Sequence, residues 1–283
     1  MSAPDTFAGT AAGVPYVAVA PITARADVPI VVIWHLLDPP RTEAAMRAAI
    51  PLDGLDAWRI YLGLPMSGSR LPAGGTEEVM KRLMQDAVLQ VHGPITAQAV
   101  SEFEPALVEL RTTLGIAEGP VAVVGGSLGS AVALLSLLES PVRIAAAVAV
   151  SPLVQVRTFI DAVSGQFGAP YVWSPESTAV ADRLDFVARA DDFVERGAPP
   201  VLLIIGAEDD RTAFGGPAAL LRDELGRRYA DPTRVDLREI QNMEHALSDE
   251  PGIDAAPQTP HAAEADALAV DWLRRHLMVG DAG

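Results

Sequence analysis

Residues 120–140 constrain the fold of this chain more than any other segment. A β-branched run, Val121–Val124, stops at Gly125, and Ser127 and Gly129 follow at two-residue intervals before an apolar helical stretch begins. Gly-x-Ser-x-Gly between a strand and a helix is typical of a nucleophile elbow, a strained turn that exposes a serine hydroxyl above a sheet. Both flanking positions are glycine because a Cβ there would clash with the neighbouring strand and helix. The pattern predicts Ser127 as a nucleophile.

Glycine-rich turns between a strand and a helix also bind phosphates, and the spacing distinguishes the two. The dinucleotide-binding pattern has glycine at its first, third and sixth positions, and here Ser127 or Leu128 would occupy the third. A P-loop needs Gly-Lys-Ser/Thr, yet Lys81 is the only lysine of the chain. A nucleotide-dependent oxidoreductase is therefore disfavoured, and a purely structural turn is the alternative that remains.

The composition disfavours several classes of partner and site. The formal charge of −16 argues against nucleic acid and anionic membranes as partners, because both require Lys/Arg patches. With no cysteine in the chain, disulfides, thiolate metal sites and cysteine nucleophiles are ruled out. No basic residue precedes Arg25 and no apolar run reaches membrane-spanning length, so we expect neither a secretory signal nor a membrane span. These features predict a cytoplasmic protein.

Apolar β-branched runs alternate with helical patterns, which is typical of a mostly parallel sheet with helices on both faces. We expect strands at Tyr16–Val19, Ile30–His35, Trp58–Leu62, Val121–Val124, Ala145–Val150, Val201–Ile205 and Arg234–Glu239. Helical patterns cover Glu43–Ala49, Ala97–Thr113, Ser130–Leu138, Gly216–Tyr229 and His261–Leu277. The Pro/Gly-rich pieces Pro65–Gly75 and Pro251–Pro260 are expected to be surface loops. The length of 283 residues fits a single α/β domain, residues 1–283, with an insertion.

The alternation breaks between Pro152 and Pro199, and residues 152–199 are predicted to form a small helical cap over the active site. A polar helical pattern covers Glu176–Arg189, and four aromatic side chains precede it, which is more than a plain linker needs. The alternative is an ordinary pair of packing helices with a long connection. The four aromatic residues are candidates for substrate binding: Phe159, Phe167, Tyr171 and Trp173.

A serine nucleophile needs a histidine base, and elimination among five histidines favours His245. Four of them have other assignments from their positions: a helix end (His276), a helix start (His261), a turn before Gly-Pro (His92) and a strand end upstream of the elbow (His35). His245 instead follows the last predicted strand by a short loop. It therefore stands at a strand's carboxyl end, where α/β sheets place their chemistry.

The carboxylate that orients the histidine is expected in the turn after Val201–Ile205. Three acids lie there, Glu208, Asp209 and Asp210. Asp209 is favoured, with Asp210 second and Glu208 third, because a buried orienting carboxylate leans toward the histidine while its neighbours face water. The chain order of serine, acid and histidine is the one expected of an elbow-type hydrolase.

Together these motifs resemble those of the α/β-hydrolase superfamily over nearly the whole chain. Gly125–Gly129 is similar to its nucleophile motif, Gly206–Asp209 to its Gly-x-x-Asp acid turn, and Met243–Ala246 to its histidine loop. The resemblance implies an α/β-hydrolase fold and supports Asp209 over Asp210 as the acid. It does not identify a subfamily.

One departure concerns the oxyanion hole, where backbone amides hold the negative charge of the tetrahedral intermediate. Superfamily members often carry His-Gly at the end of the third strand, whereas here His35 is followed by Leu36 and Leu37. By position, the backbone amide of Leu37 is expected to hold the oxyanion together with the amide of Leu128 at the start of the helix, and Leu36 is the second choice for this donor. His35 is interpreted as a residue that braces this loop.

The sequence thus predicts a serine hydrolase that cleaves a carboxylic ester or related acyl bond of a small molecule, without metal or cofactor. Ser127, His245 and Asp209 are its predicted triad. Amide or peptide hydrolysis and acyl transfer use the same triad and remain alternatives. A non-catalytic ligand-binding protein of the same fold is a further one.

Overall fold

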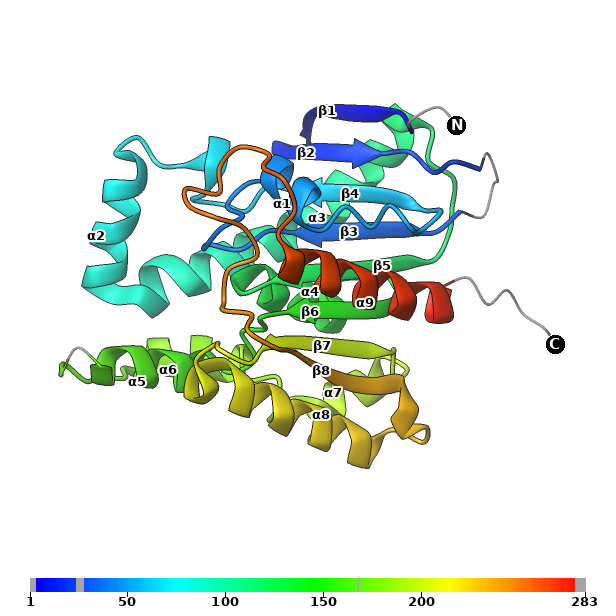
Figure 1. Cartoon of the computed structure of the whole chain (residues 1–283). Coiled ribbons are helices and arrows are strands. Elements are labelled where there is room, and N and C mark those ends of the chain that lie inside the picture. Colours follow the sequence, from blue (N-terminus) through cyan, green and yellow to red (C-terminus); the bar gives the residue numbers. More distant parts are fainter. Residues whose placement is uncertain (1–3, 24–27, 167, 278–283) are drawn as a thin grey trace.

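The computed structural model describes residues 4–23, 28–166 and 168–277, and its centre is an eight-stranded sheet in the order β1-β2-β4-β3-β5-β6-β7-β8 (Figure 1). Strands β3 to β8 are parallel, whereas β1 and β2 pair antiparallel at one edge. The strands are β1 Thr6–Ala11, β2 Val14–Val19, β3 Ile30–Trp34, β4 Trp58–Leu62, β5 Val121–Gly126, β6 Ile144–Val150, β7 Val201–Gly206 and β8 Val235–Ile240. The predicted mostly parallel sheet is confirmed.

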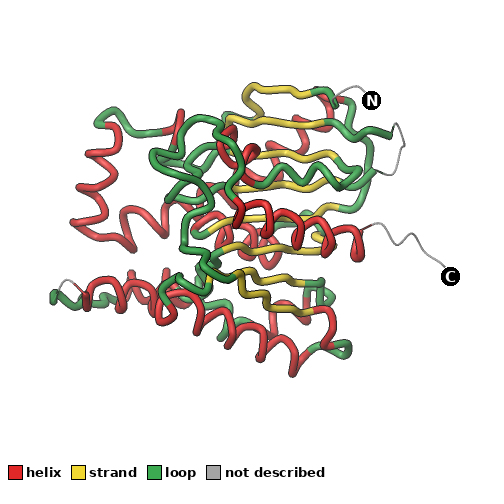
Figure 2. Tube along the Cα trace, viewed as in Figure 1, coloured by secondary structure: helices red, strands yellow, loops and turns green. Residues whose placement is uncertain are grey.

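Helices cover both faces of the sheet and define two hydrophobic cores (Figure 2). One core packs α3, α4, α7 and α8 against the sheet, and the other packs α1 and α9. Strands β5 and β7 are buried along their whole length because both faces are covered, which explains their unbroken apolar runs. The helices are α1 Glu43–Ala49, α2 Gly75–Ala87, α3 Gly93–Leu114, α4 Leu128–Glu139, α5 Val156–Gln166, α6 Pro175–Arg183, α7 Ala190–Glu195, α8 Gly216–Arg228 and α9 Pro260–Leu277.

Strands β3 and β5 are parallel neighbours in the sheet although β4 lies between them in the chain. From β3 the chain adds β4 on one side and then returns to add β5 on the other, so the sheet has a topological switch point between β3 and β5. Such a switch point leaves a crevice outside the carboxyl ends of the strands, where α/β proteins bind ligands. The loops that follow β3, β5, β7 and β8 all leave the sheet on this side (left in Figure 1). All the predicted catalytic residues are in these loops.

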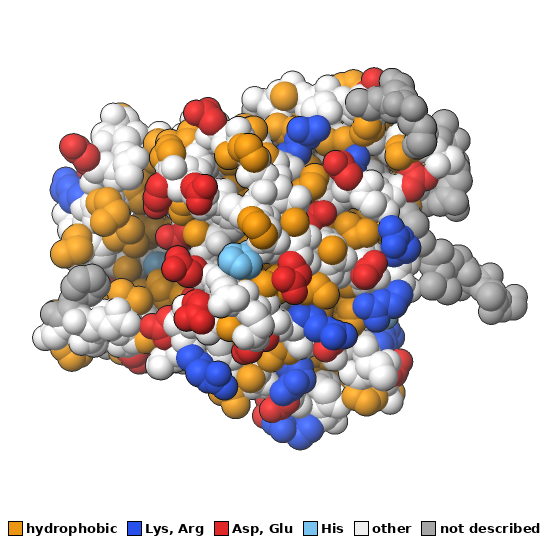
Figure 3. Space-filling model, viewed as in Figure 1, with side chains coloured by type: hydrophobic (Ala, Val, Ile, Leu, Met, Phe, Trp, Pro, Cys, Tyr) orange, Lys and Arg blue, Asp and Glu red, His pale blue; other side chains and the backbone are white. Residues whose placement is uncertain are grey.

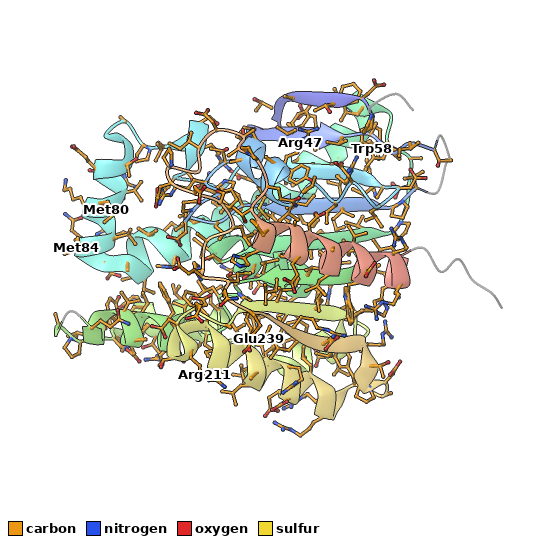
Figure 4. All side chains as sticks on the ribbon, viewed as in Figure 1. Arg47, Trp58, Met80, Met84, Arg211 and Glu239 are labelled. Carbon is orange, nitrogen blue, oxygen red and sulfur yellow. The ribbon has the colours of Figure 1, made fainter. Side chains whose placement is uncertain are left out.

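Two elements near the N-terminus were not predicted from the sequence. Strand β1 is exposed at every position but Ala11, so it has no apolar run that marks it as a strand. It forms a hairpin with β2 through Ala12 and Gly13, which both have positive φ (48° and 82°). Helix α2 is polar, with only Val79 buried, and Met80 and Met84 extend from it with exposed fractions of 52% and 84% (Figure 4).

The largest differences from the expected boundaries are in two helical regions. Helix α3 begins at Gly93 rather than Ala97, because Pro94 occupies the first turn, where a missing N–H costs nothing. A π-helical turn, Val88–His92, precedes it, so His92 lies in a helical segment rather than in a loop turn. The expected helix Glu176–Arg189 is confirmed only as far as Arg183, where α6 ends; residues 184–189 form turns and a β-bridge, and α7 begins beyond the expected helix, at Ala190.

Residues 152–199 contain α5, α6 and α7. Helix α7 packs on α8 and α4 as part of the layer that covers the sheet. Helices α5 and α6 instead contact the π-helical turn Val88–His92, and α5 also contacts a second π-helical turn, Arg211–Gly215, that follows β7. Helices α2, α5 and α6 therefore extend beyond the carboxyl ends of the strands (Figure 1).

Candidate active site

The turn between β5 and α4 holds Ser127 in a strained backbone conformation, with φ 47° and ψ −120°. The Ser127 N–H donates to the carbonyl of Val150 on β6 at 3.0 Å, which anchors the turn to the neighbouring strand. A Cβ on Gly125 would lie 2.1 Å from the carbonyl oxygen of Gly129, and a Cβ on Gly129 would lie 2.3 Å from that of His35. The strain is imposed by tight packing on both sides, as the sequence pattern predicts.

His245 lies between the serine and an aspartate. Its Nε2 is 2.8 Å from Ser127 Oγ, and its Nδ1 is 2.8 Å from Asp209 Oδ2. The Asp209 side chain is only 3% exposed, and its Oδ1 accepts the backbone N–H of Asp210 at 2.7 Å. The structure thus brings together the three side chains predicted as a triad, in the geometry of a nucleophile, a base and an orienting acid.

Direct backbone bonds hold the acid loop and the histidine loop against each other. The N–H of Glu208 donates to the carbonyl of Met243 at 3.0 Å, and a Cβ on Gly206 would lie 2.1 Å from that same oxygen. The hydroxyl of Ser151, just after β6, donates to the backbone carbonyl of His245 at 2.9 Å. Sequence reasoning missed Ser151, since only its place after a strand distinguishes it from other serines.

Two backbone amides are free to receive an oxyanion. Within the described residues, the N–H groups of Leu128 and Leu37 have no hydrogen-bond partner. Leu128 is the first residue of α4, where N–H groups are unsatisfied by the helix itself. The other predicted donor, Leu36, is wrong: its N–H donates to the carbonyl of Pro40 at 3.1 Å, which closes the turn after β3.

His35 fixes the orientation of this loop. Its Nδ1 lies 2.6 Å from the carbonyl of Leu36 and its Nε2 accepts the N–H of Leu64 at 2.9 Å, so the ring is neutral with the proton on Nδ1. Burial lowers the pKa of His35 to about 4, which keeps this arrangement at neutral pH. Because C=O and N–H of a trans peptide point to opposite sides, holding the Leu36 carbonyl directs the Leu37 N–H away from His35.

Aromatic rings continue from His245 toward the segment predicted as a cap. The ring centroid of Phe214 lies 4.1 Å from that of His245, with the two rings tilted by 32°. The centroid of Phe159 lies 5.4 Å from that of Phe214, and the centroid of His92 lies 5.4 Å from that of Phe159. Sequence reasoning selected Phe159 but missed Phe214 and His92. Phe214 lies in the π-helical turn after the acid loop. Its position shortly after Asp209 in the sequence is the signal that could have identified it as a residue of the site.

The other aromatic candidates have different surroundings. The hydroxyl of Tyr171 donates to Asp86 at 2.7 Å, and Trp173 donates to Asp161 at 2.8 Å. Their rings contact each other at 4.7 Å rather than the ring of His245. Phe167 lies outside the described residues.

A hollow opens between α2 and α5 at this end of the molecule, with hydrophobic side chains on its walls and Asp or Glu side chains at its border (Figure 3). Among the residues described, no three His, Asp or Glu side chains come together as a metal site. Nor does any described helix have the length and apolar character needed to cross a membrane.

Comparisons with known proteins agree with this architecture. The structure resembles a dienelactone hydrolase from Anabaena variabilis (TM-score 0.58, 17% identity, covering 98% of this chain and 100% of the other). It also resembles an acylaminoacyl peptidase from Pyrococcus horikoshii (0.63, 14%, 99% and 43%) and a puromycin-hydrolysing peptidase from Mycobacterium tuberculosis (0.65, 15%, 99% and 41%). At these identities the likeness concerns the fold, and the chain spans less than half of either peptidase.

A search of curated protein sequences found no match. The model of the prolyl oligopeptidase family, however, matches residues 97–278, which is more than half of the chain and includes the serine elbow, the acid turn and the histidine loop. The chain therefore belongs to the prolyl oligopeptidase family, a family of serine hydrolases with the α/β-hydrolase fold.

Proposed function

We propose that this protein hydrolyses a carboxylic ester or related acyl bond of a small molecule through an acyl-enzyme on Ser127. The observation that carries the proposal is the continuous hydrogen-bonded line from Ser127 Oγ through His245 to Asp209, with 2.8 Å at each step. A serine hydroxyl is a weak nucleophile by itself, and such a line supplies both a base and the carboxylate that stabilises the imidazolium.

The first half of the reaction forms the acyl-enzyme. Ser127 Oγ attacks the carbonyl carbon while its proton moves to His245 Nε2, and Asp209 stabilises the charge that develops on the ring. The carbonyl oxygen becomes an oxyanion, to which the backbone N–H groups of Leu128 and Leu37 donate hydrogen bonds; one such donor typically contributes about 10²–10³-fold to the rate. His245 then gives the proton to the leaving alcohol, and the C–O bond of the ester breaks.

The second half releases the acid. Water attacks the acyl-enzyme while His245 Nε2 takes one of its protons. The second tetrahedral intermediate then collapses: the bond between the acyl carbon and Ser127 Oγ breaks, His245 returns the proton to Oγ, and the carboxylic acid leaves. The ring series of Phe214 and Phe159 beside His245 supports an apolar acyl or alcohol group as the part of the substrate that the site holds. We further propose that α5 and α6 act as the cap over this site.

The experiment that tests the proposal is labelling with a fluorophosphonate probe, followed by intact mass. Wild type is expected to gain one adduct, and Ser127→Ala is expected to gain none and to lose ester hydrolysis while it keeps its circular dichroism spectrum. Ser136→Ala is a suitable control, because Ser136 lies on α4 behind the elbow and is buried away from solvent. An unlabelled but folded wild type would contradict the proposal and favour a non-catalytic binding protein.

Amide or peptide hydrolysis is the second candidate, and membership in the prolyl oligopeptidase family supports it. A 4-nitrophenyl ester and a 4-nitroanilide of the same acyl group separate the two reactions. A ratio of kcat/KM that strongly favours the ester, with negligible anilide turnover, would support the esterase. Comparable turnover of both would support the peptidase.

A further inference from the structure

A second carboxylate faces the reacting atoms. Asp38 follows β3 in the oxyanion loop, and its Oδ2 lies 3.7 Å from His245 Nε2, the same nitrogen that contacts Ser127 Oγ at 2.8 Å. Asp209 is on the opposite side of the ring, at Nδ1. The mechanism proposed above gives a role to Asp209 but none to Asp38.

The charge of Asp38 is not neutralised by a cation of the protein. In the described part of the chain, no Arg or Lys side chain pairs with it; its one ion-pair contact is with His245. Arg41, three residues later, instead pairs with Glu250 at 2.7 Å and donates to the carbonyl of Leu37 at 2.9 Å. The Asp38 side chain is 53% exposed, so a ligand can reach it.

The loop that carries Asp38 is held at both ends. The Leu36 N–H donates to Pro40 at 3.1 Å, the Leu247 N–H to Pro39 at 3.0 Å, and the Arg41 N–H to Gly252 at 2.7 Å. The first bond closes the loop itself, and the other two join it to the segment that follows the histidine loop. The backbone that carries the carboxylate therefore has a fixed position before a substrate binds, which lowers the entropic cost of using Asp38.

The surroundings also favour a cation. The chain has a formal charge of −16, and Asp or Glu side chains lie around the hollow between α2 and α5, at the same end of the molecule as the site (Figure 3). A low-dielectric cleft bordered by one sign of charge concentrates ligands of the opposite sign. An anionic group beside the scissile bond would instead meet repulsion from Asp38.

We propose that Asp38 is a specificity-determining residue, and that the site selects substrates with an ammonium group within about two carbons of the scissile carbonyl–oxygen bond, a reach set by an ordinary ion-pair distance. The ammonium pairs with the Asp38 carboxylate while the apolar part of the substrate contacts Phe214 and Phe159. This inference rests on the proposed function, since it names the substrate class of the same site.

Two pairs of isosteric esters test it, one for each side of the bond. In the acyl pair, the 2-naphthyl ester of L-alanine is compared with 2-naphthyl isobutyrate, in which a methyl group replaces the ammonium. In the alcohol pair, butyrylcholine is compared with 3,3-dimethylbutyl butyrate. The quantity measured is the ratio of kcat/KM for the charged ester over that for the neutral ester, which cancels any loss common to both.

Asp38→Asn is expected to lower this ratio about tenfold in at least one pair, the size of effect that a partly exposed ion pair produces. The pair that responds shows whether the ammonium belongs to the acyl or the alcohol part. The control is Glu104→Gln, an exposed residue of α3 that removes the same charge without a contact to the site, and its ratios are expected to equal those of wild type.

The outcomes distinguish the two proposals. If wild type hydrolyses the neutral esters but Asp38→Asn leaves both ratios unchanged, the role of Asp38 is overturned while the serine hydrolase stands. If Glu104→Gln lowers the ratios as much as Asp38→Asn, the effect is one of net charge, and the inference fails. If no ester is hydrolysed and the phosphonate does not label Ser127, the proposed function fails and takes this inference with it.

Discussion

Asp209 and Asp210 are neighbours in the chain, yet their carboxylates have different tasks. Asp209 bonds to His245, whereas Asp210 accepts the N–H groups of Thr212 and Ala213 and the side-chain amide of Gln166. We expect Asp209→Asn to lower kcat/KM about 10³–10⁴-fold, because the amide favours the wrong histidine tautomer. Asp210→Asn is expected to stay within about tenfold of wild type and to lose up to about 1 kcal/mol of unfolding free energy as a weakened cap. Ester kinetics and urea unfolding of both variants measure this, and equal or reversed losses would reassign the acid.

At this scale the sequence predicts residues that the chemistry itself requires. Three features can be recognised in the sequence from residue type and position: a serine between two glycines, an acid after one strand and a histidine after the last strand. The supporting contacts are not visible in the same way. The Ser151 hydroxyl donates to the His245 carbonyl, and the Leu36 N–H donates to the Pro40 carbonyl. Both contacts depend on how the loops fold in three dimensions.

At the scale of elements, the elbow is a close contact between β5, α4 and the end of β3. A Cβ on Gly129 would lie 2.3 Å from the carbonyl oxygen of His35 and 2.8 Å from that of Trp34, which are backbone atoms that cannot turn aside. We expect Gly129→Ala to lower the free energy of unfolding by about 3 kcal/mol or more and to abolish activity. Gly226→Ala, in α8, is the matched control: a Cβ there meets nothing within 4 Å, so a gain of about 0.5–1 kcal/mol is expected from helix propensity. Urea unfolding curves decide this, and a Gly129→Ala protein as stable as wild type would contradict the packing argument.

Elements buried on both faces were predictable, whereas several at the borders of the molecule were not. Strands β3 to β7 each have an apolar run that burial requires, whereas the edge strand β8 was predicted although Arg238 and Glu239 are exposed. Strand β1 is exposed and depends on pairing with β2, and α2 is a polar helix whose Asp86 departs from helical φ/ψ. Helix α5 was not predicted either, because its residues were assigned to an aromatic, turn-rich part of the predicted cap without a helix of their own. A local sequence pattern carries little information about an element whose secondary structure is determined by tertiary contacts.

At the scale of the whole molecule, one buried and one partly buried group make stability depend on pH in opposite directions. Burial lowers the pKa of His35 to about 4, so between pH 6.5 and 4 the unfolded chain binds a proton that the folded protein does not, and stability falls with falling pH. Burial raises the pKa of Asp266 to about 6, so the folded protein takes up a proton first as the pH falls below 6, and stability rises. The pH profile of wild type is therefore a sum in which these contributions partly cancel.

Replacing each group separately should reveal its contribution to the pH dependence of stability. His35→Gln keeps an acceptor for Leu64, and Asp266→Asn keeps the acceptor for the N–H of Leu52. Between pH 7 and pH 5, the stability advantage of wild type over His35→Gln is expected to shrink by about 2 kcal/mol, because only wild type pays to keep an imidazole neutral. Asp266→Asn is expected to lose about 1 kcal/mol more than wild type over the same interval, a value reduced for the partial exposure of that carboxyl. Urea unfolding at both pH values tests the two signs independently, and parallel profiles for wild type and both variants would show that neither group titrates differently in the folded state.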